Sequence, residues 1–527
     1  MKESFQIRLL PHGRQIYGRN GRSLMEALVE ASIFLRSDCG GKGSCGKCRV
    51  HKTTTTGEME SITACNYAVT EDLAIEIPEK AMLSSYVISK APVSFPLSFL
   101  NRKKEADAEE SYGVAVDLGT TTIAVYLCSR SQGTVLSSVA VKNPQALYGD
   151  DVMSRIAAIG DDESNLRHLQ RMVVNAIEWG INELLCSQSI DKAEISRMVV
   201  VGNPTMIHIL SGVDPKPIGL SPYQPAFYEA RTIDSEIVGF HLNNAPLLTL
   251  PQISGFIGGD IISAALGTDL MSQPNGTLLV DLGTNGELLF KAQDRLFATS
   301  CATGPAFEGA SLSCGMQAIP RAINKVVIED RIDYPHHTII DSTKKTHPLG
   351  ICGTGVISGI AELWRNKLIA SGGAFITDSS VKPLQKNAKN QLQYTLVEAN
   401  GNSAISSVYI SQKDVRSVQL GKAALITGIE FLTKAAGYLQ PEKIIIAGAF
   451  GSYIDKRDMI TIGMLPEIDQ EKIEIAGNSA GAGAVMVLCE EEYFNKSIEL
   501  AEKITTIELT TNRRFQEVFV EKLSFSK

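Results

Sequence analysis

The sequence lacks the features that would place a protein in a membrane or on nucleic acid. It has no apolar run long enough to span a bilayer, and Met1-Lys2-Glu3-Ser4 leads directly into an alternating strand pattern rather than a signal peptide. Positive charge is in deficit, because 50 Lys and Arg against 58 Asp and Glu give a net charge of −8. No basic patch is available for nucleic acid or anionic lipid. We therefore expect a cytoplasmic protein with no nucleic-acid and no membrane partner.

Cysteine is scarce outside one N-terminal loop. The chain has 10 cysteines in 527 residues, and 44% of its residues are apolar, as in globular chains of about three or four domains. Six cysteines are isolated in apolar or glycine-rich surroundings, which predicts reduced, buried thiols. These six are Cys128, Cys186, Cys301, Cys314, Cys352 and Cys489.

The other four cysteines form the pattern C-x5-C-x2-C-x16-C at Cys39, Cys45, Cys48 and Cys65, with glycines among the first three. Thiolates bind iron or zinc, but a cluster also needs backbone N–H groups directed at several sulfurs, which a glycine-rich loop supplies. Zinc sites more often show two separate C-x-x-C pairs. The pattern favours a 2Fe-2S cluster, with zinc as the alternative.

The segments around this loop have the pattern of a small sheet. Residues 5–10 and 14–17 alternate like two strands, Ser23 begins a helix with capping-box spacing, and 73–77 has the pattern of a last strand. This order resembles the β-grasp fold of plant-type and adrenodoxin-type ferredoxins. The fourth cysteine comes sooner than in those ferredoxins, so we expect the fold to be trimmed at 51–64.

Two short turns of nearly the same sequence occur far apart, at Asp117 to Thr122 and at Asp281 to Gly286, each between two apolar runs. Both are predicted β-hairpins with polar tips. Glycine lets backbone N–H groups approach a phosphate, threonine hydroxyls add donors, and aspartate can hold a hydrated magnesium ion. One copy is common in ordinary β proteins, but two copies in two halves favour phosphate binding. The predicted phosphate-binding residues are Gly119, Thr120, Thr121, Thr122, Gly283, Thr284 and Asn285.

A third element is the apolar strand at 443–452, which ends in small residues. There Gly448, Ala449 and Gly451 would leave bare backbone for an adenine or ribose, and the alternative is a buried strand with a glycine turn. The three elements and their order resemble the actin, sugar kinase and heat-shock-70 ATPase superfamily, with its phosphate-1, phosphate-2 and adenosine loops. The resemblance implies two ribonuclease-H-like halves that close over ATP.

That superfamily also has a helix at the hinge before the second hairpin, and residues 258–267 occupy this place. Asp260, near its start, is a candidate to position the attacking water beside magnesium, and its alternative role is to N-cap the helix. Asp117 and Asp281 would hold magnesium through water. These three aspartates are the predicted catalytic residues.

A linker separates the predicted ferredoxin domain from the predicted ATPase. It contains Pro92, Pro96 and a charged run at 102–110. It is a solvated spacer, a tether that lets the cluster swing toward an acceptor, or both. The predicted fold class is α+β and α/β. The predicted domains are a β-grasp 2Fe-2S ferredoxin domain at 1–80, the linker at 81–111, and a two-lobed, ribonuclease-H-like (actin-like) ATPase with lobes at 112–270 and 271–527.

An N-terminal 2Fe-2S domain joined to such an ATPase resembles, from end to end, the reductive activators of corrinoid-dependent methyltransferases. Some relatives carry an extra middle domain between ferredoxin and ATPase, for which the short linker leaves no room. An inference about a dimer built on that domain does not transfer. The resemblance also covers residues 143–145, 149–152, 201–206, 304–309 and 351–355.

The family resemblance implies that one electron passes from the 2Fe-2S cluster to a corrinoid protein, where inactive Co(II) cobalamin becomes Co(I). A plant-type cluster has a reduction potential of about −400 mV, which is generally not low enough to reduce Co(II) to Co(I). Each ~59 mV of shortfall lowers the equilibrium constant of this one-electron step about tenfold. ATP with Mg²⁺ would drive the step by changing which state of the partner is bound. A low-potential flavodoxin, ferredoxin or reductase would reload the cluster, and the family suggests a homodimer.

Two other functions fit the same residues. One is ATP-dependent electron donation to a different low-potential enzyme, as in dehydratase activators of similar ATPase fold, although those usually hold a 4Fe-4S cluster between subunits. The other is a redox sensor, in which cluster oxidation gates nucleotide binding and a partner recognises the closed form. A sensor predicts negligible ATP turnover, whereas an activator should hydrolyse ATP.

Overall fold

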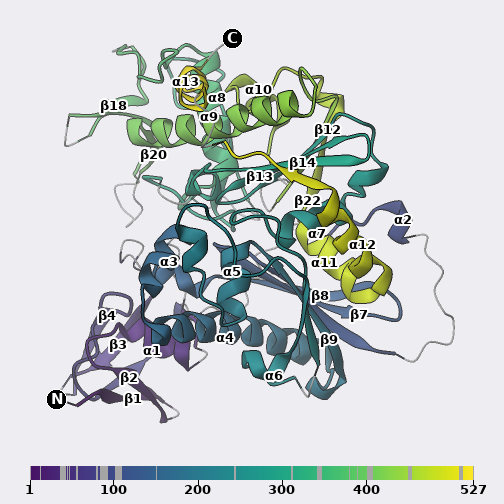
Figure 1. Ribbon diagram of the computed structural model, residues 1–527. Coiled ribbons are helices and arrows are strands. Elements are labelled where there is room, and N and C mark those ends of the chain that lie inside the picture. The colour runs from purple at the N-terminus through teal and green to yellow at the C-terminus, as the bar shows by residue number, and fades with distance from the viewer. Residues whose placement is uncertain are drawn as a thin grey trace.

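Three parts follow one another along the chain (Figure 1): a small N-terminal sheet, a lobe built on one six-stranded sheet, and a second lobe built on another. No described helix has the length and apolar character needed to cross a bilayer. The computed structural model describes residues 2–11, 13–31, 33–35, 43, 46, 48–54, 57–78, 81–82, 93–100, 110–149, 151–242, 245–309, 312–340, 347–378, 380–387, 390–399, 407–448, 454–509 and 514–525.

The N-terminal part is a five-stranded sheet in the order β2-β1-β5-β3-β4. Strand β1 pairs antiparallel with β2 and parallel with β5, which confirms the predicted β-grasp arrangement. Ser23 accepts a hydrogen bond from the backbone N–H of Glu26 and caps α1, whose Leu24 and Leu28 are buried. The hairpin of β3 and β4 fills the short segment before the fourth cysteine. The elements are β1 (Ser4–Leu10), β2 (Arg14–Arg19), α1 (Leu24–Glu30), β3 (Arg49–Thr53), β4 (Met59–Thr63) and β5 (Leu73–Glu76).

The sheet of the first lobe has the order β10-β11-β9-β6-β7-β8. Strands β6, β7 and β8 form an antiparallel meander, and β9 lies parallel to β6. The long helix α4 covers the face that carries Ile123 and Val125. The elements are β6 (Tyr112–Leu118), β7 (Thr122–Ser129), β8 (Thr134–Lys142), the 3₁₀ turn η2 (Pro144–Leu147), α3 (Val152–Ile159), α4 (Glu163–Gln188), β9 (Ile195–Gly202), α5 (Pro204–Leu210), β10 (Arg231–Asp234), α6 (Ser235–Val238), β11 (Pro246–Thr249) and α7 (Gly259–Gly267).

The second lobe repeats this arrangement in the order β22-β21-β12-β13-β14-β23. Here β12, β13 and β14 form the meander and β21 lies parallel to β12, so both lobes are ribonuclease-H-like, as predicted. Two three-stranded sheets are added to it. The elements are β12 (Thr277–Leu282), β13 (Gly286–Ala292), β14 (Arg295–Cys301), the 3₁₀ turn η6 (Pro305–Glu308), β15 (Ala322–Val327), β16 (His336–Ile339), β17 (Gly350–Ile351), α8 (Gly353–Arg365), β18 (Leu384–Lys386), β19 (Leu392–Val397), β20 (Val408–Ser411), α9 (Gln412–Ala435), β21 (Lys443–Ala447), α10 (Lys456–Thr461), β22 (Ile473–Gly477), α11 (Ser479–Cys489), α12 (Glu491–Lys503), β23 (Ile504–Thr506) and α13 (Phe515–Lys522).

Helices α7 and α11 pack against each other between the two sheets (Figure 1). The hydroxyl of Ser263 donates a hydrogen bond to the carbonyl oxygen of Ala480 at 2.6 Å. A Cβ added at Gly483 would lie 1.9 Å from the Ser263 carbonyl oxygen, so the two helices approach as closely as glycine allows. Because α11 also packs on β6 and β9, the C-terminal part of the chain crosses back onto the first lobe.

The linker is anchored at its short helix α2 (Leu97–Leu100). Phe99 is fully buried, and its ring centroid lies 5.7 Å from that of Tyr493 on α12. Ser98 donates a hydrogen bond to the carboxylate of Asp269. The expectation of a solvated spacer is therefore wrong for this segment, because an aromatic side chain inserts into the core between the lobes.

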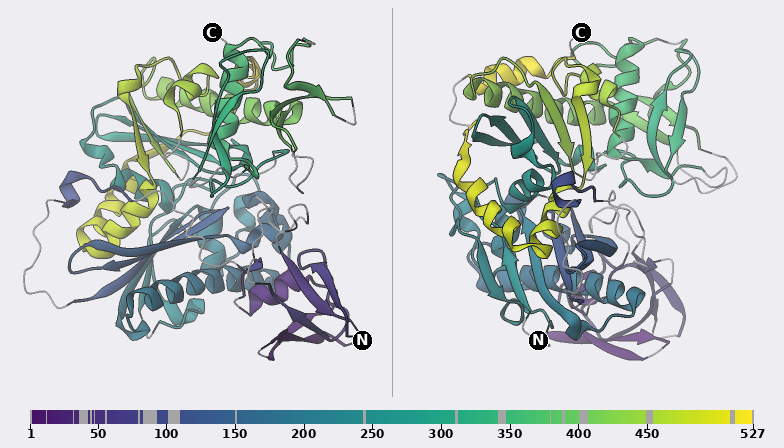
Figure 2. Two further views of the ribbon diagram at one scale, coloured as in Figure 1. Left: turned by 180° about the vertical axis from the view of Figure 1, so that it is seen from behind. Right: turned by 90° about the vertical axis from the view of Figure 1, so that its right-hand side faces the viewer.

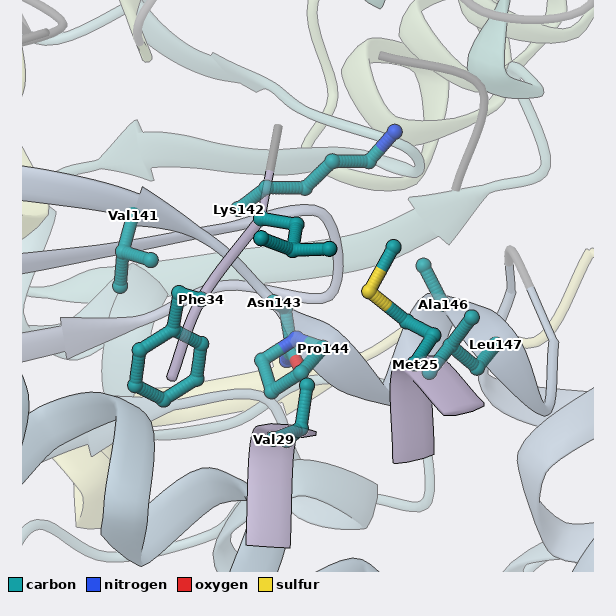
Figure 3. A pocket seen from close by; sticks show the side chains of 10 residues that line it. Met25, Val29, Phe34, Val141, Lys142, Asn143, Pro144, Ala146 and Leu147 are labelled. Carbon is teal, nitrogen blue, oxygen red and sulfur yellow. The ribbon is translucent and has the colours of Figure 1, made fainter. Parts of the chain in front are cut away.

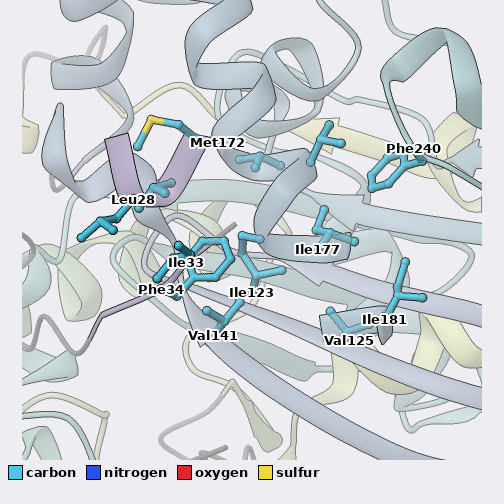
Figure 4. Close-up of a cluster of buried hydrophobic side chains, with 14 of the residues drawn as sticks. Leu28, Ile33, Phe34, Ile123, Val125, Val141, Met172, Ile177, Ile181 and Phe240 are labelled. Atoms are coloured by element: carbon cyan, nitrogen blue, oxygen red, sulfur yellow. The ribbon is translucent and has the colours of Figure 1, made fainter. Parts of the chain in front are cut away.

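The ferredoxin part lies against the first lobe, as two views show (Figure 2). Leu28, Ile33 and Phe34 enter one hydrophobic cluster with strands and helices of the lobe (Figure 4). The ring of Phe34 meets that of Trp179 on α4 edge-on, with centroids 5.8 Å apart. A cavity remains beside this contact, where Met25 and Phe34 face the segment 141–147 (Figure 3).

A polar contact adds to this interface. The Nδ1 atom of His168 lies 2.9 Å from a carboxylate oxygen of Glu30, and the Asn175 amide donates to the Glu30 carbonyl oxygen at 3.2 Å. Burial acts to raise the pKa of Glu30, but His168 and nearby arginines hold it below its ordinary value. The end of α1 is thus tied to α4 by both apolar and polar contacts.

Candidate functional site

The two predicted phosphate-binding turns lie face to face. The first is closed by a hydrogen bond from the N–H of Gly119 to the carbonyl oxygen of Thr122 at 3.1 Å. In the second, the N–H of Gly283 donates to the carbonyl oxygen of Asn285 at 2.9 Å. The hydroxyl oxygens of Thr121 and Thr284 are 2.9 Å apart. Because the two hairpins occupy the same place in the two sheets, folding brings their tips to one cleft.

This cleft gathers the described members of the predicted ATP site. The roles of these residues remain predictions, and four predicted site residues, Ala449, Gly451, Cys39 and Cys45, lie outside the described residues. The cleft is lined by Asp117, Gly119, Thr120, Thr121, Thr122, Asn203, Asp260, Asp281, Leu282, Gly283, Thr284, Asn285, Glu287, Glu308, Gly448, Asn478 and Ala480.

Negative charge dominates the cleft. Carboxylates come from Asp117, Asp260, Asp281, Glu287 and Glu308, and no described Lys, Arg or His lines it. Burial, followed by the charge of Asp117, raises the pKa of Asp260 to about 7. Burial, Asp260 and Asp281 raise the pKa of Glu287 well above its ordinary value. A bound cation would therefore stabilise the ionised forms of these acids.

The donor set fits a hydrated magnesium ion. Mg²⁺ prefers oxygen ligands, keeps several waters, and is usually bound by one or two carboxylates together with substrate phosphates. Among the described residues, no three His, Cys, Asp or Glu side chains converge closely enough to hold a metal directly. The predicted contact of Asp117 and Asp281 through water is compatible with this spacing.

Asp260 does not occupy the N-cap position that was its alternative role. Helix α7 begins at Gly259 and its N-cap residue is Gly258, which has no side chain to form a cap. Asp260 lies in the first turn, where one carboxylate oxygen accepts the N–H of Ile261 at 2.9 Å, and it lines the cleft. A role in positioning water stays a prediction.

The described part of the cysteine loop contains two of the four predicted ligands. The sulfur atoms of Cys48 and Cys65 are 3.3 Å apart, because the hairpin of β3 and β4 brings its ends together. Two metal–sulfur bonds of tetrahedral geometry place sulfurs about 3.8 Å apart, so this pair fits one metal ion. Gly43 and Gly46 have φ of 75° and 62°, which favours glycine in this loop.

The scattered cysteines are free thiols in the described structure. The prediction of burial is wrong for Cys186, which is exposed in the last turn of α4. Cys128, Cys301 and Cys352 are buried, and Cys314 and Cys489 are half-buried.

Three family descriptions match successive parts of the chain. The "2Fe-2S iron-sulfur cluster binding domain" matches residues 7–70, the "RACo middle region" matches 112–273, and the "C-terminal domain of RACo the ASKHA domain" matches 275–527. A solved structure, the reductive activator for corrinoid, iron-sulfur protein, is 27% identical, with a TM-score of 0.73 over 99% of this chain and 98% of its own.

Corrinoid activation enzyme RamQ of Eubacterium limosum is 30% identical to this chain, and the alignment covers 92% of this chain and 93% of RamQ. The chain belongs to the family of reductive activators of corrinoid proteins. Another relative, the [Co(II) methylated amine-specific corrinoid protein] reductase of Methanosarcina barkeri, is 26% identical over 79% of this chain and 77% of its own. The 2Fe-2S description decides between iron and zinc at the cysteine loop, and the middle region coincides with the first lobe.

In this activator, three side chains to which the sequence analysis gave no role form hydrogen bonds with the turn at residues 117–122. Asn143 donates to the carbonyl oxygen of Gly119 at 3.0 Å, and Asn203 donates to the hydroxyl of Thr120 at 2.9 Å. The buried Arg155 donates to the Thr120 carbonyl oxygen. Asn143 and Asn203 directly follow β8 and β9, and the ends of these strands lie at the same sheet edge as the turn. This position at a strand end is the sequence feature from which their place near the turn could have been predicted.

Two further residues reach the cleft from the second half of the chain. Asn478, the N-cap of α11, donates to the carboxylate of Asp117 at 3.0 Å and to the hydroxyl of Tyr126 at 2.6 Å. Glu308 accepts hydrogen bonds from the hydroxyls of both facing threonines. Glu308 lies in the family segment 304–309, whereas no local pattern marked Asn478.

Proposed function

We propose that this protein activates the corrinoid protein of a methyltransferase system by passing one electron from its 2Fe-2S cluster to inactive Co(II) cobalamin, which becomes Co(I), in a step driven by ATP. The observation that carries the proposal is the end-to-end likeness to relatives named as corrinoid activation enzyme and corrinoid protein reductase. One chain combines a ferredoxin fold with a two-lobed nucleotide cleft, as this reaction requires.

In this proposal, the four loop cysteines hold the cluster, which supplies a one-electron carrier. Cys48 and Cys65 support this role by their 3.3 Å sulfur separation. Cys39 and Cys45 complete the set by their place in the sequence pattern.

The cleft residues take the roles that their placement favours. The turns 119–122 and 283–285 would bind phosphates, Asp117 and Asp281 would hold Mg²⁺ through water, and Asp260 would position the attacking water. Gly448, with Ala449 and Gly451, would pack against the nucleoside.

ATP would act by favouring one arrangement of the lobes. A ligand shifts such an equilibrium only through its differential affinity for the two states, and phosphates contacted by both turns favour the closed one. The ferredoxin domain packs on the lobe that carries the phosphate-1 turn. Nucleotide binding and the position of the cluster are therefore linked through one lobe.

The surrounding partners complete the proposal. A low-potential flavodoxin, ferredoxin or reductase would reload the cluster after each transfer, and the reaction would take place in the cytoplasm. The net charge of −8 supports the absence of a nucleic-acid partner. A homodimer is part of the proposal on family resemblance alone.

To test this function, the anaerobically reduced protein is mixed with a Co(II) corrinoid protein from the same cell, and the absorbance band of Co(I) is followed. We expect Co(I) only when Mg-ATP is present. Asp281→Asn should slow ATP hydrolysis by about 10²–10³-fold and leave the visible spectrum of the cluster intact, because it removes charge that holds magnesium. Cys45→Ala should lose both the cluster and Co(I) formation.

Two results would count against this function. Co(I) formation by Cys45→Ala would exclude the cluster as the electron relay. A lack of Co(I) with an intact cluster and the cognate partner would favour another acceptor if ATP is still hydrolysed, and the redox sensor if ATP turnover is negligible.

A further inference from the structure

A carboxylate of the protein itself lies between the two phosphate-binding turns. One oxygen of Glu308 accepts hydrogen bonds from the Thr121 hydroxyl and from the Thr284 hydroxyl, both at 2.6 Å. Hydrogen bonds of this length between a hydroxyl and a carboxylate are among the strong ones in proteins. Because Thr121 belongs to the first lobe and Thr284 to the second, Glu308 bridges the lobes at the tips of both hairpins.

We propose that the Glu308 carboxylate occupies the phosphate site of the nucleotide-free cleft, competes with phosphate for the two threonine hydroxyls, and is displaced when ATP enters. The inference rests on the proposed binding of ATP in this cleft. A phosphate oxygen and a carboxylate oxygen are both anionic acceptors of hydroxyl hydrogen bonds, so they compete for the same two threonines. They also repel each other, since no described cationic side chain lines the cleft to separate them.

The backbone on both sides of Glu308 fixes the place of this residue in the cleft. Glu308 ends the turn η6 between Gly304 and Gly309, whose φ values of 75° and 73° favour glycine. The neighbouring Phe307 is buried, and η6 packs against α8 and α9. Because Phe307 anchors the turn in the core, displacement of Glu308 requires rotation of its side chain rather than release of the loop.

A role in holding magnesium or water makes the opposite prediction for nucleotide affinity. If Glu308 held the metal with ATP bound, removal of its charge would weaken the binding of Mg-nucleotide. If Glu308 competes with phosphate, removal of the charge strengthens it. The sign of the change in affinity therefore separates the two roles.

The experiment measures binding by calorimetry to the anaerobic, cluster-loaded, full-length protein. The probes are the magnesium complex of AMP-PNP, a non-hydrolysable ATP analogue, and adenosine, measured by competition. Glu308→Gln keeps the shape of the side chain and loses its charge, so we expect AMP-PNP to bind about tenfold more tightly. Adenosine, which has no phosphate, should bind with unchanged affinity. The matched control is Glu467→Gln, an exposed glutamate of the same lobe, which should bind both like the wild type.

Two outcomes of the Glu308→Gln experiment would overturn the inference. AMP-PNP affinity in Glu308→Gln that is unchanged or weaker would show that Glu308 does not compete with phosphate. Equal tightening of AMP-PNP and adenosine would indicate a general structural effect. If Glu308→Gln fails to fold, Glu308→Asp, which retracts the carboxylate by one methylene, must change affinity in the same direction. A wild-type protein with intact cluster that binds no AMP-PNP would overturn the proposed function itself, and the inference with it.

Discussion

At the scale of single residues, the carboxylates that line the cleft disfavour the binding of an anion unless a cation is also bound. Asp260 has a pKa raised to about 7 by burial and by Asp117, and Glu287 is shifted in the same direction. A bound Mg²⁺ would favour the ionised carboxylates and would offset their repulsion of the nucleotide phosphates. The cleft should therefore select the magnesium complex of ATP over free ATP.

The shifted pKa of Asp260 predicts how stability depends on pH. An aspartate in the unfolded chain has a pKa of about 3.9, so between about pH 4 and pH 7 the native ligand-free protein binds more protons at this position. The free energy of unfolding should fall as pH rises through this range. We expect the melting temperature of the wild type to drop more between pH 5 and pH 8 than that of Asp260→Asn, as measured by differential scanning calorimetry. Parallel pH profiles would contradict the shift.

The sequence allowed some site residues to be predicted and not others, for a physical reason. Asp117 and Asp281 were found because each precedes a glycine turn at the end of an apolar strand, which is a local pattern. Asn478 lies 361 residues from Asp117, and the contact exists only because α11 crosses back onto the first lobe. Glu308 meets Thr121 across the cleft, 187 residues away in the sequence. Such contacts depend on the tertiary fold, which no local spacing encodes.

At the scale of elements, the close packing of α7 and α11 sets how the two lobes meet. Gly483→Ala would place a Cβ 1.9 Å from the carbonyl oxygen of Ser263, a backbone atom that cannot rotate away. Overpacking of this kind costs about 1–3 kcal/mol, so we expect a lower urea midpoint and slower ATP hydrolysis. Gly372→Ala is the matched control, because nothing lies within 4 Å of its added Cβ. Equal midpoints for the two variants would contradict the tight helix contact.

The elements show the same limit of sequence reasoning. The two hairpins and the strand β21 were predicted from apolar runs that end in glycine turns, and the helix α7 from superfamily order. The structure has all of them close to the expected places. The packing of α11 on both lobes could not be predicted. Its residues 479–488 are all buried, so the helix has no polar face to indicate which side meets which neighbour.

At the scale of the whole molecule, the ferredoxin domain is a docked part of the structure rather than a free one. Its helix α1 shares a hydrophobic cluster with α4 and with β7, the strand that begins at Thr122 (Figure 4). The linker is anchored to α12 through Phe99. Any motion of the cluster toward a partner must therefore break the contact between α1 and the first lobe.

That contact predicts the effect of truncating Phe34, which is buried at the interface beside Trp179. Phe34→Ala should weaken docking, because loss of a buried phenylalanine costs about 3–5 kcal/mol. We expect faster amide hydrogen exchange along the α4 face that meets α1, with the cluster spectrum retained. Tyr17→Ala removes an aromatic ring that is 62% exposed on the same domain, and it should leave this exchange unchanged. If both variants exchange like the wild type, the docked arrangement does not depend on this ring.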